Sequence, residues 1–137
     1  MSSVTSALSD VAASLSPDEL TKKVDEIKAA GNERFLKGDY TQAKALYTDA
    51  LSLNPNIVAI YSNRAICELK LEQYGLAIAD ATKAIELDAT FAKAYYRRAC
   101  AHLAILDPKA ALPDLKMVVK LDPRNAQVKM QLDATSK

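Results

Sequence analysis

The sequence is short of the residues on which several common site chemistries depend. Its 137 residues include no tryptophan, two cysteines and one histidine, His102. Two cysteines cannot form a disulfide framework, and we expect Cys67 and Cys100, both in apolar helical context, to be small core residues in a reducing compartment. One histidine is too few for the ligands of a two-metal phosphoesterase, and no glycine-rich phosphate loop is present. We therefore predict that this chain is not an enzyme and needs no metal or other cofactor.

Long apolar runs and an excess of one charge are also missing. No uncharged stretch approaches the roughly 18 apolar residues of a membrane span, and the first residues lack the pattern of a signal peptide. With 18 basic and 17 acidic residues, the net charge is +1. This balance gives no general attraction to nucleic acid or membranes, so an anion site has to come from local clustering. We expect a soluble intracellular protein.

The residues that are present favour an all-α fold. Half of the chain is hydrophobic but only 6% is aromatic, and it contains three glycines. Alanine and leucine with few β-branched clusters are typical of helical domains. Residues 1–15 are rich in serine and alanine without a period, which predicts a disordered tail. A folded domain over 16–135 should begin at Ser16, whose side chain can form a capping box with Glu19.

A 34-residue period organises the folded part. Tyr40 recurs as Tyr74, and Ala43 recurs as Ala77 and Ala111. Each unit reads as two helices of about 14 to 16 residues around a tight turn, which is the tetratricopeptide period. We predict a right-handed superhelix of three repeats and a seventh helix over the open end. Their approximate bounds are 24–57, 58–91, 92–125 and, for the seventh helix, 124–134.

The third repeat departs from the pattern of the first two. Pro108 stands where they have Tyr40 and Tyr74, and Pro113 falls inside the second helix of the pair. A proline beyond the first helical turn removes a hydrogen bond and clashes with the preceding turn. We therefore predict a bent or loosened helix near Lys109.

Polar residues on the first helix of each repeat predict an anion site. The positively charged pair Lys93 and Arg97 shares one helical face, which is unfavourable unless an anion lies between the two side chains. The alternative is a solvated basic face. In a superhelix the first helices line one concave groove, where lysine, arginine and asparagine together suit a carboxylate. The residues that converge there are Lys28, Asn32, Asn63, Lys93 and Arg97.

These five residues resemble the two-carboxylate clamp of tetratricopeptide domains in heat-shock co-chaperones. The resemblance implies binding of a C-terminal Glu-Glu-Val-Asp peptide, of the Hsp90 class first and the Hsp70 class second. It places Lys28, Asn32 and Asn63 around the terminal carboxylate, and Lys93 and Arg97 toward acidic side chains. It also implies a basic supporting residue, Lys70, and apolar contacts to the valine from Phe35 and Ile66.

Residues 73–88, 93–99 and 117–120 are similar to the N-terminal tetratricopeptide domain of a family of serine/threonine protein phosphatases. This resemblance implies a regulatory and targeting domain of the cytoplasm and nucleus, which inhibits a phosphatase domain that is not in this chain. Two alternatives remain: a chaperone adaptor without a phosphatase, and a groove that serves mainly as an intramolecular lid. RNA is disfavoured by the even charge and the lack of aromatic stacking positions on the basic face.

Overall fold

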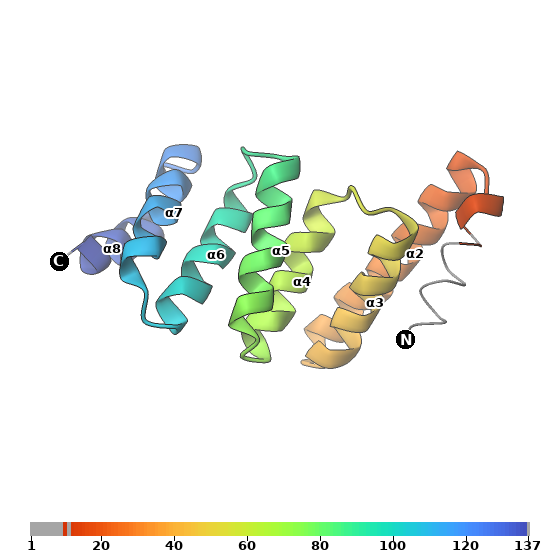
Figure 1. The fold of residues 1–137 in the computed structure, drawn as a ribbon, viewed down its shortest axis with the longest axis horizontal. Coiled ribbons are helices and arrows are strands. Elements are labelled where there is room, and N and C mark those ends of the chain that lie inside the picture. The colour runs from red at the N-terminus through yellow and green to blue at the C-terminus, as the bar shows by residue number, and fades with distance from the viewer. Residues whose placement is uncertain (1–9, 11, 137) are drawn as a thin grey trace.

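The structure is a computed structural model that describes residue 10 and residues 12–136, and its helices follow one another as antiparallel pairs (Figure 1). The pairs are α2 with α3, α4 with α5, and α6 with α7, and α8 packs against α7. No strand occurs in the described part of the chain, so the all-α prediction is confirmed. The helices are α2 (Pro17–Leu36), α3 (Tyr40–Leu53), α4 (Val58–Lys70), α5 (Tyr74–Leu87), α6 (Ala92–Ala104), α7 (Pro108–Leu121) and α8 (Ala126–Ser136).

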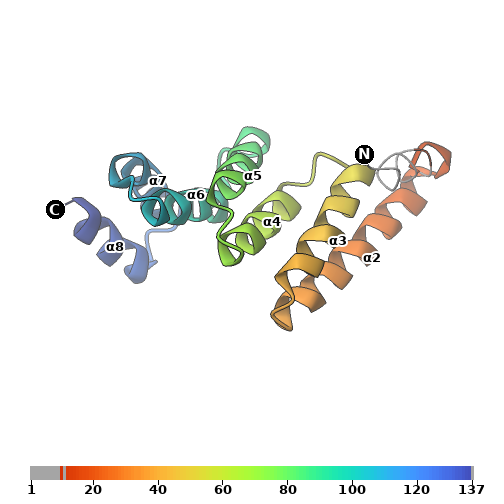
Figure 2. The same ribbon diagram turned by 60° about the horizontal axis from the view of Figure 1, so that its bottom comes forward.

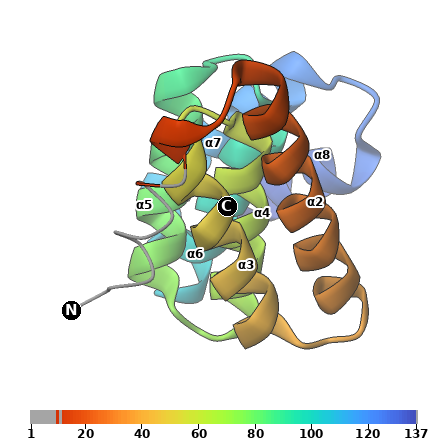
Figure 3. The ribbon, with the colours of Figure 1, turned by 90° about the vertical axis from the view of Figure 1, so that its right-hand side faces the viewer.

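The pairs stack side by side along the length of the molecule, from α2 at one end to α8 at the other (Figures 1 and 2). Seen along this axis, successive pairs overlap while turning relative to one another, as a superhelix requires (Figure 3). The first helices of the second and third pairs, α4 and α6, also contact each other directly. Side chains on these helices can therefore share one surface. No described helix is long and apolar enough to cross a membrane.

Helix α2 starts where the sequence predicted, and hydrogen bonds at both of its ends explain its bounds. Ser16 Oγ accepts from the Glu19 backbone at 3.2 Å, and the Ser16 backbone donates to Glu19 Oε1 at 3.0 Å, which completes the capping box. At the other end, Gly38 has φ 77°, and Asp39 N donates to Arg34 O at 2.9 Å. This is a Schellman motif, in which a left-handed residue ends the helix.

The same turn recurs in the other two repeats without glycine. Glu72 has φ 60° and Leu106 has φ 62°, at the positions 34 and 68 residues beyond Gly38. In both turns the following backbone N–H, of Gln73 or Asp107, closes the motif. A left-handed conformation is unfavourable for a residue with a side chain, so these two turns are less stable than the first.

The predicted disordered tail needs a correction. Residues 1–9 and 11 of that tail lie outside the described residues, whereas 12–14 are helical. Ala12 packs against the core cluster that contains Val24. The prediction is therefore wrong for 12–14, because this small apolar side chain finds a buried surface that a period-based analysis does not reveal.

Buried alanines, several of them at recurring positions of the 34-residue period, allow paired helices to approach closely. The buried helix-facing alanines include Ala43, Ala50, Ala77, Ala81, Ala84 and Ala111. Cys67 is buried as expected, but Cys100 is only partly buried, so the core prediction is wrong for that residue. Helix α7 continues through Pro113 without a break, because its buried face of Ala111, Leu115 and Val118 packs in the C-terminal core cluster.

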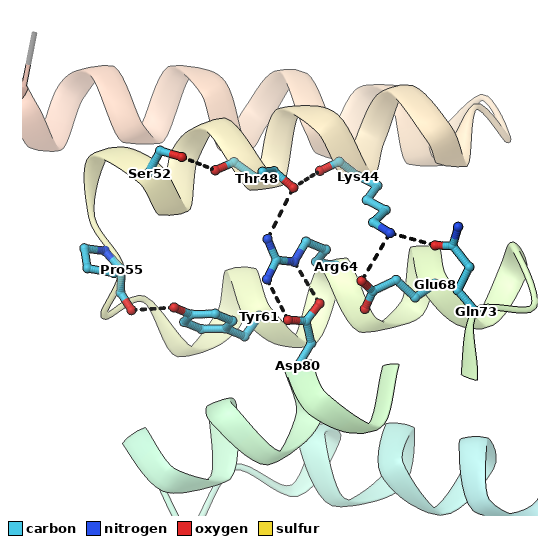
Figure 4. A network of polar contacts seen from close by, with 9 residues as sticks. All are labelled: Lys44, Thr48, Ser52, Pro55, Tyr61, Arg64, Glu68, Gln73 and Asp80. Atoms are coloured by element: carbon cyan, nitrogen blue, oxygen red, sulfur yellow. Dashed lines mark hydrogen bonds and ion pairs between the residues drawn. The ribbon is translucent and has the colours of Figure 1, made fainter. Parts of the chain in front are cut away.

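An arginine joins each repeat to the one before it. Arg64 of α4 makes a bidentate contact with Asp80 of α5, at 2.7 and 2.6 Å, and donates to Thr48 of α3 at 3.2 Å (Figure 4). Arg98 repeats the contact 34 residues later with Asp114 at 2.9 and 2.7 Å and with Thr82 at 3.2 Å. Paired guanidinium and carboxylate groups fix geometry well, so these contacts set how successive repeats meet.

Candidate anion-binding groove

Two asparagines from different repeats meet at the N-terminal end of the groove. Asn32 Oδ1 of α2 accepts from Tyr47 Oη at 2.5 Å and from Asn63 Nδ2 of α4 at 3.4 Å. Since the Asn32 oxygen is engaged twice, its NH₂ group is left to donate. A carboxylate is the natural acceptor for such a donor.

Tyr47 reaches Asn32 because Gly31 has no side chain. A Cβ at Gly31 would lie 2.7 Å from Tyr47 Cε1, closer than atoms can approach. Burial, followed by the Cys67 thiol, raises the pKa of Tyr47 to about 12. The hydroxyl therefore stays protonated at neutral pH and donates to Asn32, which holds the amide in one orientation.

An apolar pocket of about 190 Å³ opens beside the two asparagines. Its walls come from α2, α3 and α4, and Phe35 is supported by an edge-on contact with Tyr40, with ring centroids 5.3 Å apart. A pocket with apolar walls and two amides at its edge can hold a small apolar side chain next to a carboxylate. The lining residues are Asn32, Phe35, Leu36, Tyr47, Asn63 and Ile66.

The cations Lys93 and Arg97 line a second pocket, of about 270 Å³, on α6. Tyr96 lies between them in sequence, and the Arg97 guanidinium is 5.5 Å from the centre of its ring. The opposite wall comes from Val118 and the α7–α8 turn, where Asp122 and Asn125 lie. This pocket can take an acidic group that contacts both cations.

The neighbours Arg97 and Arg98 have different surroundings. Arg98 is bound to Asp114, whereas Arg97 has no ion pair with any described residue, and its Nε is buried without a hydrogen-bond partner. Burial lowers the pKa of Arg97, and Cys100 and Tyr96 act in the opposite direction. A half-buried guanidinium without a carboxylate is unfavourable in the free protein, so this position is suited to an anionic ligand.

The structure brings four of the five predicted residues together, as two pairs. Asn32 and Asn63 are in direct contact, and Lys93 and Arg97 share the second pocket. Lys28 is partly buried on α2, one turn before Asn32, and makes no ion pair within the described residues. Of the supporting residues, Phe35 and Ile66 line the apolar pocket, while Lys70 is exposed at the end of α4.

Sequence reasoning missed Tyr47 and Leu36 as pocket residues. Tyr47 was visible only as a repeat position, and its role depends on the packing of α3 against α2. Leu36 carried a local signal, since it is an apolar residue between Phe35 and the helix end at Gly38. No group of three or more potential metal ligands occurs among the described residues.

The fold and the groove define a helical-repeat module with a binding surface, and comparison with known proteins places it in a family. The family model described as "Tetratricopeptide repeat" matches residues 28–90. The structure is similar to the first tetratricopeptide domain of Spaghetti (RPAP3) bound to the HSP90 peptide SRMEEVD, with TM-score 0.82, 30% identity, and coverage of 84% of this chain and 91% of that one. The chain belongs to the tetratricopeptide-repeat family.

Two further proteins are similar to this chain, one in structure and one in sequence. The second such domain of human RPAP3, in complex with the HSP70 peptide SGPTIEEVD, gives TM-score 0.81 and 30% identity over 86% of this chain and 98% of that one. Serine/threonine-protein phosphatase 5 of Mus musculus is 41% identical over 120 residues, which are 88% of this chain. The chain spans about a quarter, 24%, of that phosphatase.

Proposed function

We propose that this chain is a protein–protein interaction module that binds the acidic C-terminal peptide of heat-shock chaperones, ending in Glu-Glu-Val-Asp. Arg97 carries the proposal: it is a half-buried arginine at the groove without an ion pair in the described residues, beside an arginine of the same helix that has one. The similar RPAP3 domains, which hold peptides with this ending, support it.

In the proposed complex the two groups of residues take different parts of the peptide. Lys28, Asn32 and Asn63 surround the terminal carboxylate, with the Asn32 NH₂ group donating. Lys93 and Arg97 bind acidic side chains, and the apolar pocket next to Asn63 takes the valine. We propose the Hsp90 class as the first partner and the Hsp70 class as the second, in the cytoplasm and nucleus.

We further propose that the module regulates and targets a serine/threonine phosphatase, since phosphatase 5 is similar over most of this chain. In that setting its groove also inhibits the phosphatase domain until a peptide occupies it. A chaperone adaptor without a phosphatase would use the same groove residues, and so would an intramolecular lid.

Calorimetry with a pentapeptide ending in Glu-Glu-Val-Asp tests the binding function. We expect micromolar affinity for the free acid, weaker binding at high salt, and a large loss for the C-terminal amide, which lacks the carboxylate. Arg97→Ala should weaken binding by about 2 kcal/mol or more, because it strands a ligand carboxylate.

Lys116→Ala is the matched control, since it removes one positive charge from an exposed position of α7 outside the groove. It should change binding by less than about 0.5 kcal/mol. Arg98→Ala is unsuitable as a control because it would leave Asp114 without its partner. Equal losses for Arg97→Ala and Lys116→Ala, or equal binding of acid and amide, would contradict the proposal.

A further inference from the structure

Leu36 is an exposed apolar residue at the edge of the apolar pocket. It is the last residue of α2, and 84% of its surface is accessible. Single exposed leucines are common on proteins and need no explanation by themselves. Leu36, however, also lines the apolar pocket with Asn32 and Asn63. Of the large exposed apolar residues of the described chain, the others being Leu76, Ile105, Leu106 and Met130, it alone does so.

The backbone holds Leu36 in place before any ligand arrives. Gly38 N donates to Phe35 O and Asp39 N to Arg34 O, both at 2.9 Å, so the last turn of α2 is closed on both sides of Leu36. A side chain on a fixed helix end loses little conformational freedom when it is covered. The pocket therefore has a prepared apolar rim.

We propose that Leu36 is a specificity-determining contact of the groove, which covers an apolar side chain of an acidic C-terminal peptide and selects against wholly acidic tails. The inference rests on the proposed peptide-binding function. The peptide is the expected occupant of the pocket, because the two asparagines that would hold its carboxylate line the same pocket as the apolar walls.

The peptides held by the similar domains have the matching chemistry. SRMEEVD and SGPTIEEVD each carry a penultimate valine, and each has another apolar residue, methionine or isoleucine, just before the two glutamates. Asn32 and Leu36 are one helical turn apart, about 6 Å along the axis, and an extended peptide advances about 3.3 Å per residue. When the last residue of a ligand is held at Asn32, the valine next to it can enter the pocket that Asn32 and Leu36 both line, whereas the methionine or isoleucine is four residues, about 13 Å, away.

The test is a set of titrations of SRMEEVD and two alanine versions, one without its methionine and one without its valine. Leu36→Ala should weaken binding of SRMEEVD about fivefold, the effect of withdrawing roughly 40 Å² of apolar contact. The loss should be much smaller for the alanine version that lacks the side chain covered by Leu36. This coupling tests the contact between Leu36 and the valine, and the version without methionine is the matched control.

Leu36→Gln keeps the side-chain length and a good helix former, and should weaken SRMEEVD at least as much as Leu36→Ala. Leu76→Ala is the matched control, because Leu76 is 51% exposed on α5 and does not line the pocket. All three variants should melt as the parent does, since the side chains are exposed.

No loss for Leu36→Ala, the same loss for all three peptides, or an equal loss for Leu76→Ala would overturn the inference. Arg97→Ala separates this failure from failure of the proposed function. If Arg97→Ala weakens binding while Leu36→Ala does not, the groove binds the peptide and only the role of Leu36 is wrong. If Arg97→Ala binds as tightly as the parent, the peptide-binding function itself fails.

Discussion

The junction between the first and second repeats is held by more polar contacts than the junction between the second and third. Both contain the Arg–Asp–Thr contact, through Arg64 and Arg98. Only the first adds Lys44, whose Nζ lies 3.4 Å from Glu68 Oε2 and 2.7 Å from Gln73 Oε1 (Figure 4). Thirty-four residues on, the corresponding positions are Ile78, His102 and Asp107. The Arg–Asp–Thr contact, which sets the geometry of a junction, is thus present at both junctions, whereas the contacts of Lys44 are present only at the first.

Local structure adds to this difference. The third repeat has Leu106 in the left-handed region where the first has Gly38, and Pro113 inside its second helix. Both features are unfavourable on their own. We therefore expect the C-terminal half, which carries Lys93 and Arg97, to open more readily than the N-terminal half.

Removing the arginine of a junction should have the largest effect on the free energy of unfolding. Arg64→Ala leaves the buried Asp80 unpaired and should destabilise the protein by about 3 kcal/mol or more, as loss of one partner of a buried ion pair does. Arg98→Ala should be less harmful, because among the described residues no second buried carboxyl group corresponding to Glu68 lies at its junction. Urea unfolding measures both, with the exposed Arg124→Ala as control. A larger loss for Arg98→Ala would reverse the ranking of the two junctions.

Replacing Pro113 should stabilise the C-terminal half of the protein. Pro113→Ala restores a backbone donor toward the Lys109 carbonyl and should stabilise the protein by up to about 3 kcal/mol. The melting temperature of the variant reports this gain. An unchanged or lower value would show that the backbone of α7 has already adapted to the proline.

The first junction should make stability depend on pH. Burial, reinforced by Asp80, raises the pKa of Glu68 to about 8, and Lys44 and Arg64 oppose the rise. The folded state then binds more protons than the unfolded state above the ordinary carboxyl pKa. The free energy of unfolding should therefore decrease as the pH rises from about 5 to 8, by at most about 1.4 kcal/mol per pH unit.

Glu68→Gln removes this titration and should flatten the decline in stability, as followed by urea unfolding at several pH values. An undiminished decline in Glu68→Gln would show that another group is responsible.

The smallest expected effect is at the turn of the third repeat. Leu106→Gly places a residue that tolerates positive φ where the chain needs one, and should stabilise the protein by about 1 kcal/mol. Gly38→Ala should destabilise the first turn by a similar amount. Thermal unfolding of the pair measures both signs, and a loss of stability in Leu106→Gly would mean that the exposed leucine contributes more than its backbone conformation costs.

The sequence predicted the helix pairs, the capping box and the faces of the groove helices, because these depend on period and local chemistry. It did not reveal that Arg98 belongs to an ion pair, although Arg64 and Asp80 recur as Arg98 and Asp114 at the repeat spacing. The partner lies 16 residues away, so the contact depends on how two helices pack. The bond between Tyr47 and Asn32 was missed for the same reason.

The missing side chain of Gly31 has a consequence for motion in the free protein. The Tyr47 ring lies against the α2 backbone where a Cβ would be, and its hydroxyl is tied to Asn32. In so dense a contact the ring can turn over only when α2 and α3 move apart. The flipping rate of the Tyr47 ring, measured from its NMR line shapes, therefore reports how often the first repeat opens.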